Sequence, residues 1–96
     1  MIKTVKLQKE CEQYAVAKKT YGELMAEKIA QRMTELQLAD TVEMLVQYSI
    51  GRCHPLKGSR KGEYAMDLVH PHRLVFEKEG DKIQIARIIS IEDYHK

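Results

Sequence analysis

The chain has 96 residues, of which 44% are hydrophobic and 31% charged, and its formal net charge is +2. This length and composition predict one globular domain, residues 1–96, and exclude an intrinsically disordered chain. No stretch approaches the roughly 20 apolar residues of a membrane span, and the N-terminal residues show no signal-peptide pattern. We therefore expect a cytoplasmic protein with no membrane partner.

The first part of the chain predicts one strand followed by helices. Residues 2–7 are rich in β-branched residues and alternate loosely, which predicts an opening strand. Over residues 8–19 the apolar spacing becomes helical. Thr20 and Glu23 then fit a capping box for a second helix, which ends near residue 37. We assign the apolar stripe of this second helix to the core: Met25, Ile29, Met33 and Leu36.

The second part of the chain predicts one short helix and then strands. Asp40 fits the cap of a helix that ends near residue 46. Residues 47–54 favour a strand that leads into a basic loop. Further strands are expected over 63–69, 73–79 and 82–91, and the last of these suits a central position because it is apolar on both faces. Helices on one side of an antiparallel meander define an α+β fold.

The cysteines and the paired histidines do not indicate a metal site. Cys11 and Cys53 form no CxxC pair, and we expect both to be reduced thiols of a cytoplasmic protein. His70 and His72 flank a proline in what the sequence predicts to be a hairpin turn, and no third ligand has a compatible spacing. We expect no metal and no cofactor.

Positive charge is concentrated in one loop. Residues 41–62 carry four basic groups and one acid, whereas residues 63–96 carry five basic groups and seven acids. A local basic patch suits a phosphate-bearing partner, and a merely solvated loop is the alternative explanation. The basic residues of this patch are Arg52, Lys57, Arg60 and Lys61.

A group of ionisable residues could act beside this patch. Imidazole titrates near neutral pH and serves as an acid or a base, while arginine and lysine neutralise charge on a phosphorane-like transition state. A polar C-terminal tail and an ordinary turn histidine are the alternatives. The candidate residues are His54, Asp93, Tyr94 and His95, together with Arg73.

Three segments carry a resemblance to a known family: CHPLKGSRKGEYAMDL, HRLVFE and the final IEDYH. In this order, over roughly residues 50–95, they resemble the HigB branch of the RelE/ParE toxin superfamily, whose members are also described as plasmid-maintenance "killer" proteins. The resemblance implies a RelE-like fold: an N-terminal strand and two to three helices packed on one face of a small antiparallel sheet. The chain lacks the tryptophan that many members carry.

The resemblance also implies an activity and partners. It implies the toxin of a type II toxin-antitoxin system, an endoribonuclease that cuts mRNA in the ribosomal A site. The implied partners are the ribosome with its mRNA and a HigA-like helix-turn-helix antitoxin, through which alone the toxin would meet operator DNA. The implied catalytic residues are His54, Asp93, Tyr94, His95 and Arg73, and the implied RNA-binding residues are Arg52, Lys57, Arg60 and Lys61.

The implied chemistry needs no metal. A base takes the proton of a ribose 2′-OH, the oxygen attacks the adjacent phosphate, and an acid protonates the 5′-leaving oxygen, so that a 2′,3′-cyclic phosphate remains. The main alternative is a toxin of the same fold that acts by binding, for example to a topoisomerase. A regulatory module that acts only with its antitoxin on DNA is a third possibility.

Overall fold

A computed structural model describes residues 5–79 and 85–93 of the chain. The first half is helical: α1 (Val5–Glu12), α2 (Tyr14–Tyr21), α3 (Glu23–Leu38) and α4 (Val42–Gln47). Two short 3₁₀ turns, η1 (Ile50–Arg52) and η2 (Gly58–Arg60), then flank the first strand. The strands are β1 (His54–Pro55), β2 (Glu63–Asp67), β3 (His72–Glu79) and β4 (Ile85–Asp93).

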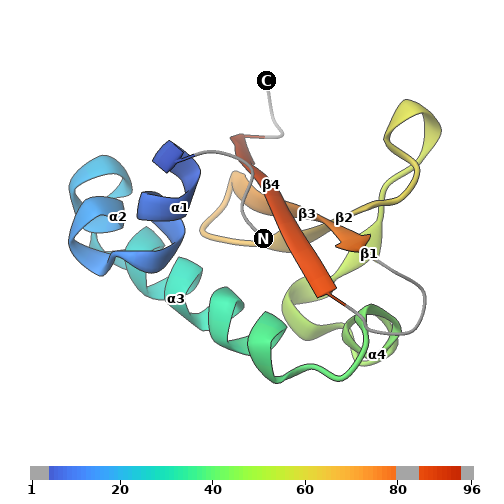
Figure 1. The fold of residues 1–96 in the computed structure, drawn as a ribbon. Helices are drawn as coiled ribbons and strands as arrows, with labels where there is room; N and C mark the ends of the chain where they lie inside the picture. The colour runs from blue at the N-terminus through green and yellow to red at the C-terminus, as the bar shows by residue number, and fades with distance from the viewer. Residues whose placement is uncertain (1–4, 80–84, 94–96) are drawn as a thin grey trace.

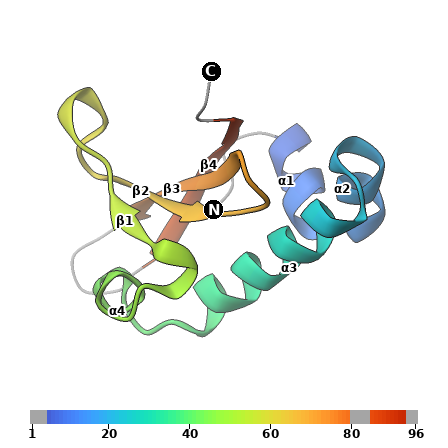
Figure 2. The ribbon, with the colours of Figure 1, turned by 180° about the vertical axis from the view of Figure 1, so that it is seen from behind.

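The four strands form one antiparallel sheet in the order β1-β2-β3-β4. Consecutive strands are neighbours, as expected for strands joined by short connections. A register shift between Val75 and Phe76 interrupts the pairing of β3 with β4. Both views place α1 and α2 at one end of α3 and α4 at its other end (Figure 1, Figure 2). The α+β class predicted from the sequence is confirmed.

The helices cover one face of the sheet, which we call the helix face. Strand residues with alternating numbers contribute to this core, as the two-residue period of a strand requires. Phe76 and Leu74 of β3 have no exposed surface, and Tyr64 stacks on Phe76 with ring centroids 5.6 Å apart. The helices supply the other half of the core: Leu7, Cys11, Ala17, Met25, Ala26, Ile29, Val42 and Leu45.

The predicted opening strand is wrong where the structure describes it. Residues 5–7 belong to α1, and residues 2–4 lie outside the described part of the chain. Leu7, Glu10 and Cys11 are the buried residues of α1, and their i, i+3, i+4 spacing is that of a helix. The β-branched Val5 that favoured a strand is 69% exposed. Burial of the helical stripe therefore outweighed β propensity.

The predicted capping box is also wrong. Thr20 lies inside α2, where its hydroxyl donates to the carbonyl oxygen of Val16 at 2.9 Å. Gly22 has a φ of 94° and both ends α2 and precedes α3. This backbone conformation favours glycine over any residue with a Cβ atom. The helix predicted over residues 8–19 is in turn divided at Gln13, which is extended.

Two further local predictions need correction. Thr41, and not Asp40, caps α4, because the Thr41 hydroxyl accepts from the Met44 backbone N–H at 3.1 Å. The strand predicted over 47–54 is wrong, because this segment contains the last residue of α4, a turn and η1, with positive φ angles at Ser49, Gly51 and Arg52. Only the last residue of that segment, at position 54, enters a strand.

The remaining elements follow the sequence prediction closely. The stripe of α3 packs as expected, with Met25 and Ile29 buried and Met33 and Leu36 half-buried against the core. The strands predicted at 63–69 and 73–79 are β2 and β3. The strand predicted at 82–91 is β4, but within the described residues it ends the strand order and is not central. Residues 80–84, between β3 and β4, lie outside the described residues.

None of the helices in residues 5–79 and 85–93 has the length and apolar character needed to cross a membrane.

Candidate functional site

The face of the sheet opposite the helix face carries charged side chains above a buried apolar floor. We call it the second face. Ala65 and Val75 lie opposite each other on β2 and β3 and have no exposed surface. Arg73 and Glu77 share this face because they alternate with the core residues of β3. Glu92 joins them, since it pairs directly with Arg73.

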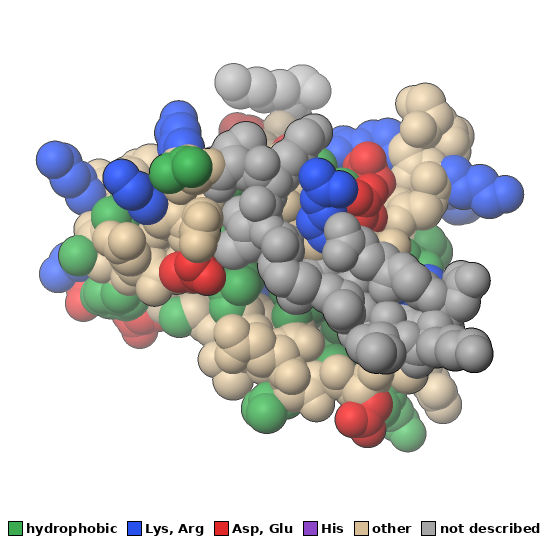
Figure 3. Space-filling view, viewed as in Figure 1, with side chains coloured by type: hydrophobic (Ala, Val, Ile, Leu, Met, Phe, Trp, Pro, Cys, Tyr) green, Lys and Arg blue, Asp and Glu red, His purple; other side chains and the backbone are tan. Residues whose placement is uncertain are grey.

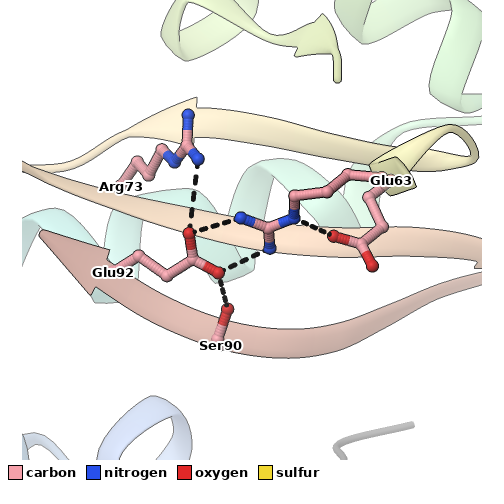
Figure 4. Close-up of polar contacts among 5 residues, drawn as sticks. Glu63, Arg73, Ser90 and Glu92 are labelled. Atoms are coloured by element: carbon pink, nitrogen blue, oxygen red, sulfur yellow. Dashed lines mark hydrogen bonds and ion pairs between the residues drawn. The ribbon is translucent and has the colours of Figure 1, made fainter. Parts of the chain in front are cut away.

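A network of hydrogen bonds and ion pairs crosses the second face. The guanidinium of Arg60 donates to both carboxylate oxygens of Glu92, at 2.8 Å and 2.6 Å, and its Nε donates to Glu63 at 2.8 Å. Arg73 donates to Oε1 of Glu92 at 3.3 Å, and the Ser90 hydroxyl donates to Oε2 at 2.6 Å. Figure 4 shows Arg73, Ser90 and Glu63 arranged around this centre. We call these five residues the Arg60–Glu92 network.

The contacts within the network favour the charged forms of Glu92 and Arg60. Hydrogen bonds from Arg60 lower the pKa of the Glu92 carboxyl to about 2, and Ser90 and Arg73 add smaller contributions in the same direction. The hydrogen bond to Glu92 in turn raises the pKa of Arg60 above its usual value. Both groups are therefore charged at neutral pH. Bidentate arginine–carboxylate pairing of this kind is among the stronger polar contacts in proteins.

His54 occupies the first strand on the same face. It lies opposite Ala65, and its exposed ring places Nδ1 2.8 Å from the backbone carbonyl oxygen of Arg52. A carbonyl oxygen only accepts hydrogen bonds, so Nδ1 carries the proton in this contact. In a neutral imidazole Nε2 is then the nitrogen with a lone pair, available to take a proton.

A buried cation holds the segment that precedes His54. Arg32 of α3 is only 7% exposed and donates through Nε to the backbone oxygen of Asp67 at 2.7 Å and through Nη1 to Glu35 at 2.8 Å. A Cβ atom at Gly51 would lie 2.7 Å from the Arg32 guanidinium carbon. Asp67 also pairs with the exposed Arg52 at 3.3 Å. Arg32 thus joins α3, η1 and the end of β2.

The remaining basic residues lie on the connection between β1 and β2. Lys57 and Lys61 are exposed there. Lys and Arg side chains gather over this part of the surface, with acidic side chains beside them (Figure 3). The four basic residues predicted to bind RNA therefore differ in their surroundings: Arg52, Lys57 and Lys61 are exposed, whereas Arg60 turns onto the sheet.

The structure separates His54 from Asp93. Two strands lie between β1 and β4, which amounts to roughly 14 Å across the sheet. Asp93 pairs with His72, whose ring packs against Tyr21 of α2 at 5.8 Å, so alternation places Asp93 on the helix face. Tyr94 and His95 lie outside the described residues. The catalytic roles expected for His54, Arg73, Asp93, Tyr94 and His95 stay predictions.

Three members of the Arg60–Glu92 network were not predicted as site residues from the sequence. Glu63, Ser90 and Glu92 were not among the candidates, although all three contact Arg60 or its partner. One signal was available. Glu92 and Asp93 are consecutive strand residues, so only one of them can share a face with Arg73.

Among the described residues, the cysteines and acids form no further candidate site for nucleophilic or metal chemistry. Cys11 and Cys53 are free and buried, and burial raises their pKa values to about 12 and about 11. Such thiols are poor nucleophiles at neutral pH. In the part of the chain that the structure describes, no group of three or more His, Cys, Asp or Glu residues could hold a metal ion.

Neither a protein-family model nor a curated protein matches the chain. Comparison with solved structures places the fold among α+β toxin folds of the RelE/YoeB type, with helices packed on a four-stranded antiparallel sheet. One such structure is a YoeB/ParE toxin from Agrobacterium tumefaciens, which superimposes with a TM-score of 0.58 at 21% sequence identity. The match covers 85% of this chain and 86% of the toxin. At this identity the likeness is one of fold.

Proposed function

We propose that the protein is the toxin of a type II toxin-antitoxin system and that it cuts mRNA on the ribosome. Two independent supports converge on this proposal. The fold resembles that of a YoeB/ParE toxin. The segments that resemble the HigB branch contain both His54 and Arg73, which lie on the same face of the sheet. That shared face is the observation that carries the proposal.

His54 is the proposed base. Its Nδ1 donates to the Arg52 carbonyl, which leaves Nε2 to accept the proton of a ribose 2′-OH. The 2′-oxygen then attacks the adjacent phosphorus, and the bond to the 5′-oxygen breaks. The products are a 2′,3′-cyclic phosphate and a free 5′-hydroxyl. The acid that protonates the 5′-oxygen is proposed to be Tyr94 or His95. Asp93 lies on the helix face, away from His54, and is proposed to position the segment that carries them.

Arg73 is the proposed stabiliser of the transition state. Its side chain lies on the second face and is only 19% exposed, so a phosphate that meets the guanidinium there loses much of its contact with water. Arg52, Lys57, Arg60 and Lys61 are proposed to contact other phosphates of the RNA. Such contacts position the chain without reading its sequence.

The proposed partners follow from the proposed function. A small protein with one modest basic patch holds RNA weakly, and correct positioning is worth several kcal/mol in such reactions. The ribosome is proposed to supply that positioning, which places the toxin in the cytoplasm. A helix-turn-helix antitoxin of the HigA type is the proposed inhibitor, and operator DNA is contacted through it.

The decisive experiment is brief induction of the toxin gene in bacteria followed by primer extension on several abundant mRNAs. We expect growth arrest together with new 5′ ends inside translated regions. In a purified system, cleavage should require translating ribosomes. Growth arrest without any cleavage would favour the alternative, a toxin of this fold that acts by binding, for example to a topoisomerase. Normal growth at confirmed soluble expression would contradict both functions.

A further inference from the structure

The Glu92 carboxylate occupies the position on Arg60 that an RNA phosphate would need. Both terminal nitrogens of the Arg60 guanidinium donate to Glu92, one to each oxygen. Arg73 donates to the same carboxylate. Guanidinium groups bind carboxylates and phosphates through the same pair of parallel N–H donors. One anion therefore excludes the other from this edge of Arg60.

The charges of the network lead to the same conclusion. Arg60 and Arg73 contribute two positive charges, and Glu63 and Glu92 contribute two negative charges, so the network is neutral as it stands. A phosphate that joined it without displacing a carboxylate would make it net negative. A phosphate that displaced Glu92 would restore the balance and gain both guanidinium groups.

Arg60 has a second contact that does not depend on Glu92 and that would hold its side chain during such an exchange. Its Nε donates to Glu63 at 2.8 Å, on a different edge of the guanidinium from the one that Glu92 occupies. Glu92 is 26% exposed along its side chain, so it borders solvent and can turn outward. Loss of the Glu92 contact would thus free the outer edge of Arg60 while Glu63 still holds the arm over the sheet.

We propose that Glu92 is an internal competitor for RNA, whose carboxylate fills the Arg60–Arg73 phosphate site until a phosphate displaces it. This inference rests on the proposed function for the identity of the ligand. Glu92 lowers the affinity of the free protein for RNA, and so limits RNA binding to settings that present the phosphate at high local concentration, such as a ribosome.

The test measures RNA binding apart from cleavage. The probe is a fluorescent 2′-O-methyl oligoribonucleotide, which lacks the attacking hydroxyl, and its dissociation constant is measured by anisotropy over a salt series. We expect Glu92→Gln to bind about 2- to 5-fold more tightly than wild type, since removal of one well-formed ion pair corresponds to roughly this factor. The salt dependence should steepen by about 0.7, the value for one additional phosphate contact on a single strand.

Glu77→Gln is the matched control. Glu77 lies on the same face of β3, pairs with Arg87 at 3.2 Å outside the network, and its replacement changes the net charge by the same amount. We expect less than a twofold change for this variant. An equal gain from Glu77→Gln would mean that net charge alone drives binding, and the proposal would fall.

The variant Glu92→Asp tests the length of the side chain separately from its charge. Aspartate keeps the negative charge but is one methylene shorter, so it cannot hold both Arg60 nitrogens from the same backbone position. We expect tighter RNA binding here too, with no change in net charge. If both Glu92 variants are folded at the assay temperature and bind the oligonucleotide no better than wild type, the proposal is overturned. If Glu92→Gln does not fold, Glu92→Asp decides alone.

The same variants distinguish this inference from the proposed function. A failure of the proposed function would appear as the absence of ribosome-dependent cleavage by the wild-type protein. The gain of Glu92→Gln and Glu92→Asp over wild type in oligonucleotide binding would survive that result. Conversely, cleavage by the wild type with no gain in either variant would retain the function and remove the competitor role.

Discussion

Arg73 and Glu92 lie directly opposite each other on β3 and β4, and a terminal nitrogen of Arg73 lies 3.3 Å from Glu92 Oε1. This cross-strand pair places an acid against the arginine that we propose to stabilise the transition state. Arg60 then reaches the same carboxylate from a connection 32 residues earlier in the chain. The acid and the two arginines form one unit, so a change in any of them will affect both binding and stability.

His54→Ala should abolish most of the cleavage while leaving ribosome binding nearly intact. A general base typically contributes about 10²–10⁴-fold to a rate, and the exposed His54 ring contributes little to packing. The measurement is single-turnover cleavage on programmed ribosomes, paired with a binding assay on the same complexes. His70→Ala, in the exposed turn between β2 and β3, is the control and should cleave at the wild-type rate. Equal rates for both variants would remove His54 from the mechanism.

Asp93→Ala and His95→Ala separate chemistry from structure at the end of the chain. Each should lower cleavage by about 10²–10⁴-fold if it acts as an acid or supports one. Asp93 lies on the helix face opposite His72, so thermal unfolding of the Asp93→Ala variant checks that its fold is retained. Cleavage at the wild-type rate by both variants would mean that the terminal segment is a polar tail. The proposed chemistry would then rest on His54, Arg73 and the basic loop alone.

Lys57→Ala and Arg60→Ala should both weaken RNA binding but differ in stability. Each removes a proposed phosphate contact, so binding should depend less steeply on salt. Lys57 is exposed, and its loss should leave the unfolding free energy within about 0.5 kcal/mol of wild type. Arg60→Ala also strips Glu92 and Glu63 of their main partner, and should cost roughly 1–2 kcal/mol. Urea titrations and binding isotherms on the same preparations test both parts.

The Glu92 carboxyl should make the protein less stable in acid. Its pKa is lowered in the folded state from 4.5 to about 2, so the folded protein binds a proton at Glu92 less readily than the unfolded chain does. The resulting stabilisation is fully present above about pH 4.5 and is lost as the pH falls towards 2. We expect a contribution of roughly 1–3 kcal/mol. Urea unfolding of wild type and Glu92→Gln between pH 2 and 6 should show the difference shrinking at low pH; a constant difference would contradict the assignment.

Two glycines with similar φ angles allow a matched test of the segment before His54. Gly51→Ala places a Cβ atom 2.7 Å from the buried Arg32 guanidinium at a φ of 58°, whereas Gly58→Ala at 67° meets open space. The left-handed conformation alone costs about 1–2 kcal/mol. We expect Gly51→Ala to cost clearly more than Gly58→Ala and to lower cleavage, since Arg32 can move only by losing its bond to Asp67. Equal losses of unfolding free energy in Gly51→Ala and Gly58→Ala would show that the Arg32 side chain moves aside at no energetic cost.

The sequence by itself determined the elements whose burial follows a local period. The stripe from Met25 to Leu36 has helical spacing, and three segments after residue 62 have the spacing or composition of strands, so these elements and the α+β class were predictable. The basic run that contains Lys57 could also be identified from the sequence, because its residues are contiguous. Residues 5–7 were misassigned because their β propensity is local, whereas the core contact of Leu7 that overrides it is not.

Only the tertiary structure decided which charged groups meet. Strand pairing sets the register, and the shift between Val75 and Phe76 fixes which face each later residue of β4 occupies. A slip of one residue would have placed Asp93 beside Arg73 and turned Glu92 towards the helices. The contact of Arg60 with Glu92 joins positions 32 residues apart and leaves no local pattern. The sequence therefore identified the basic loop, and the fold determined that one of its arginines is already bound to an acid.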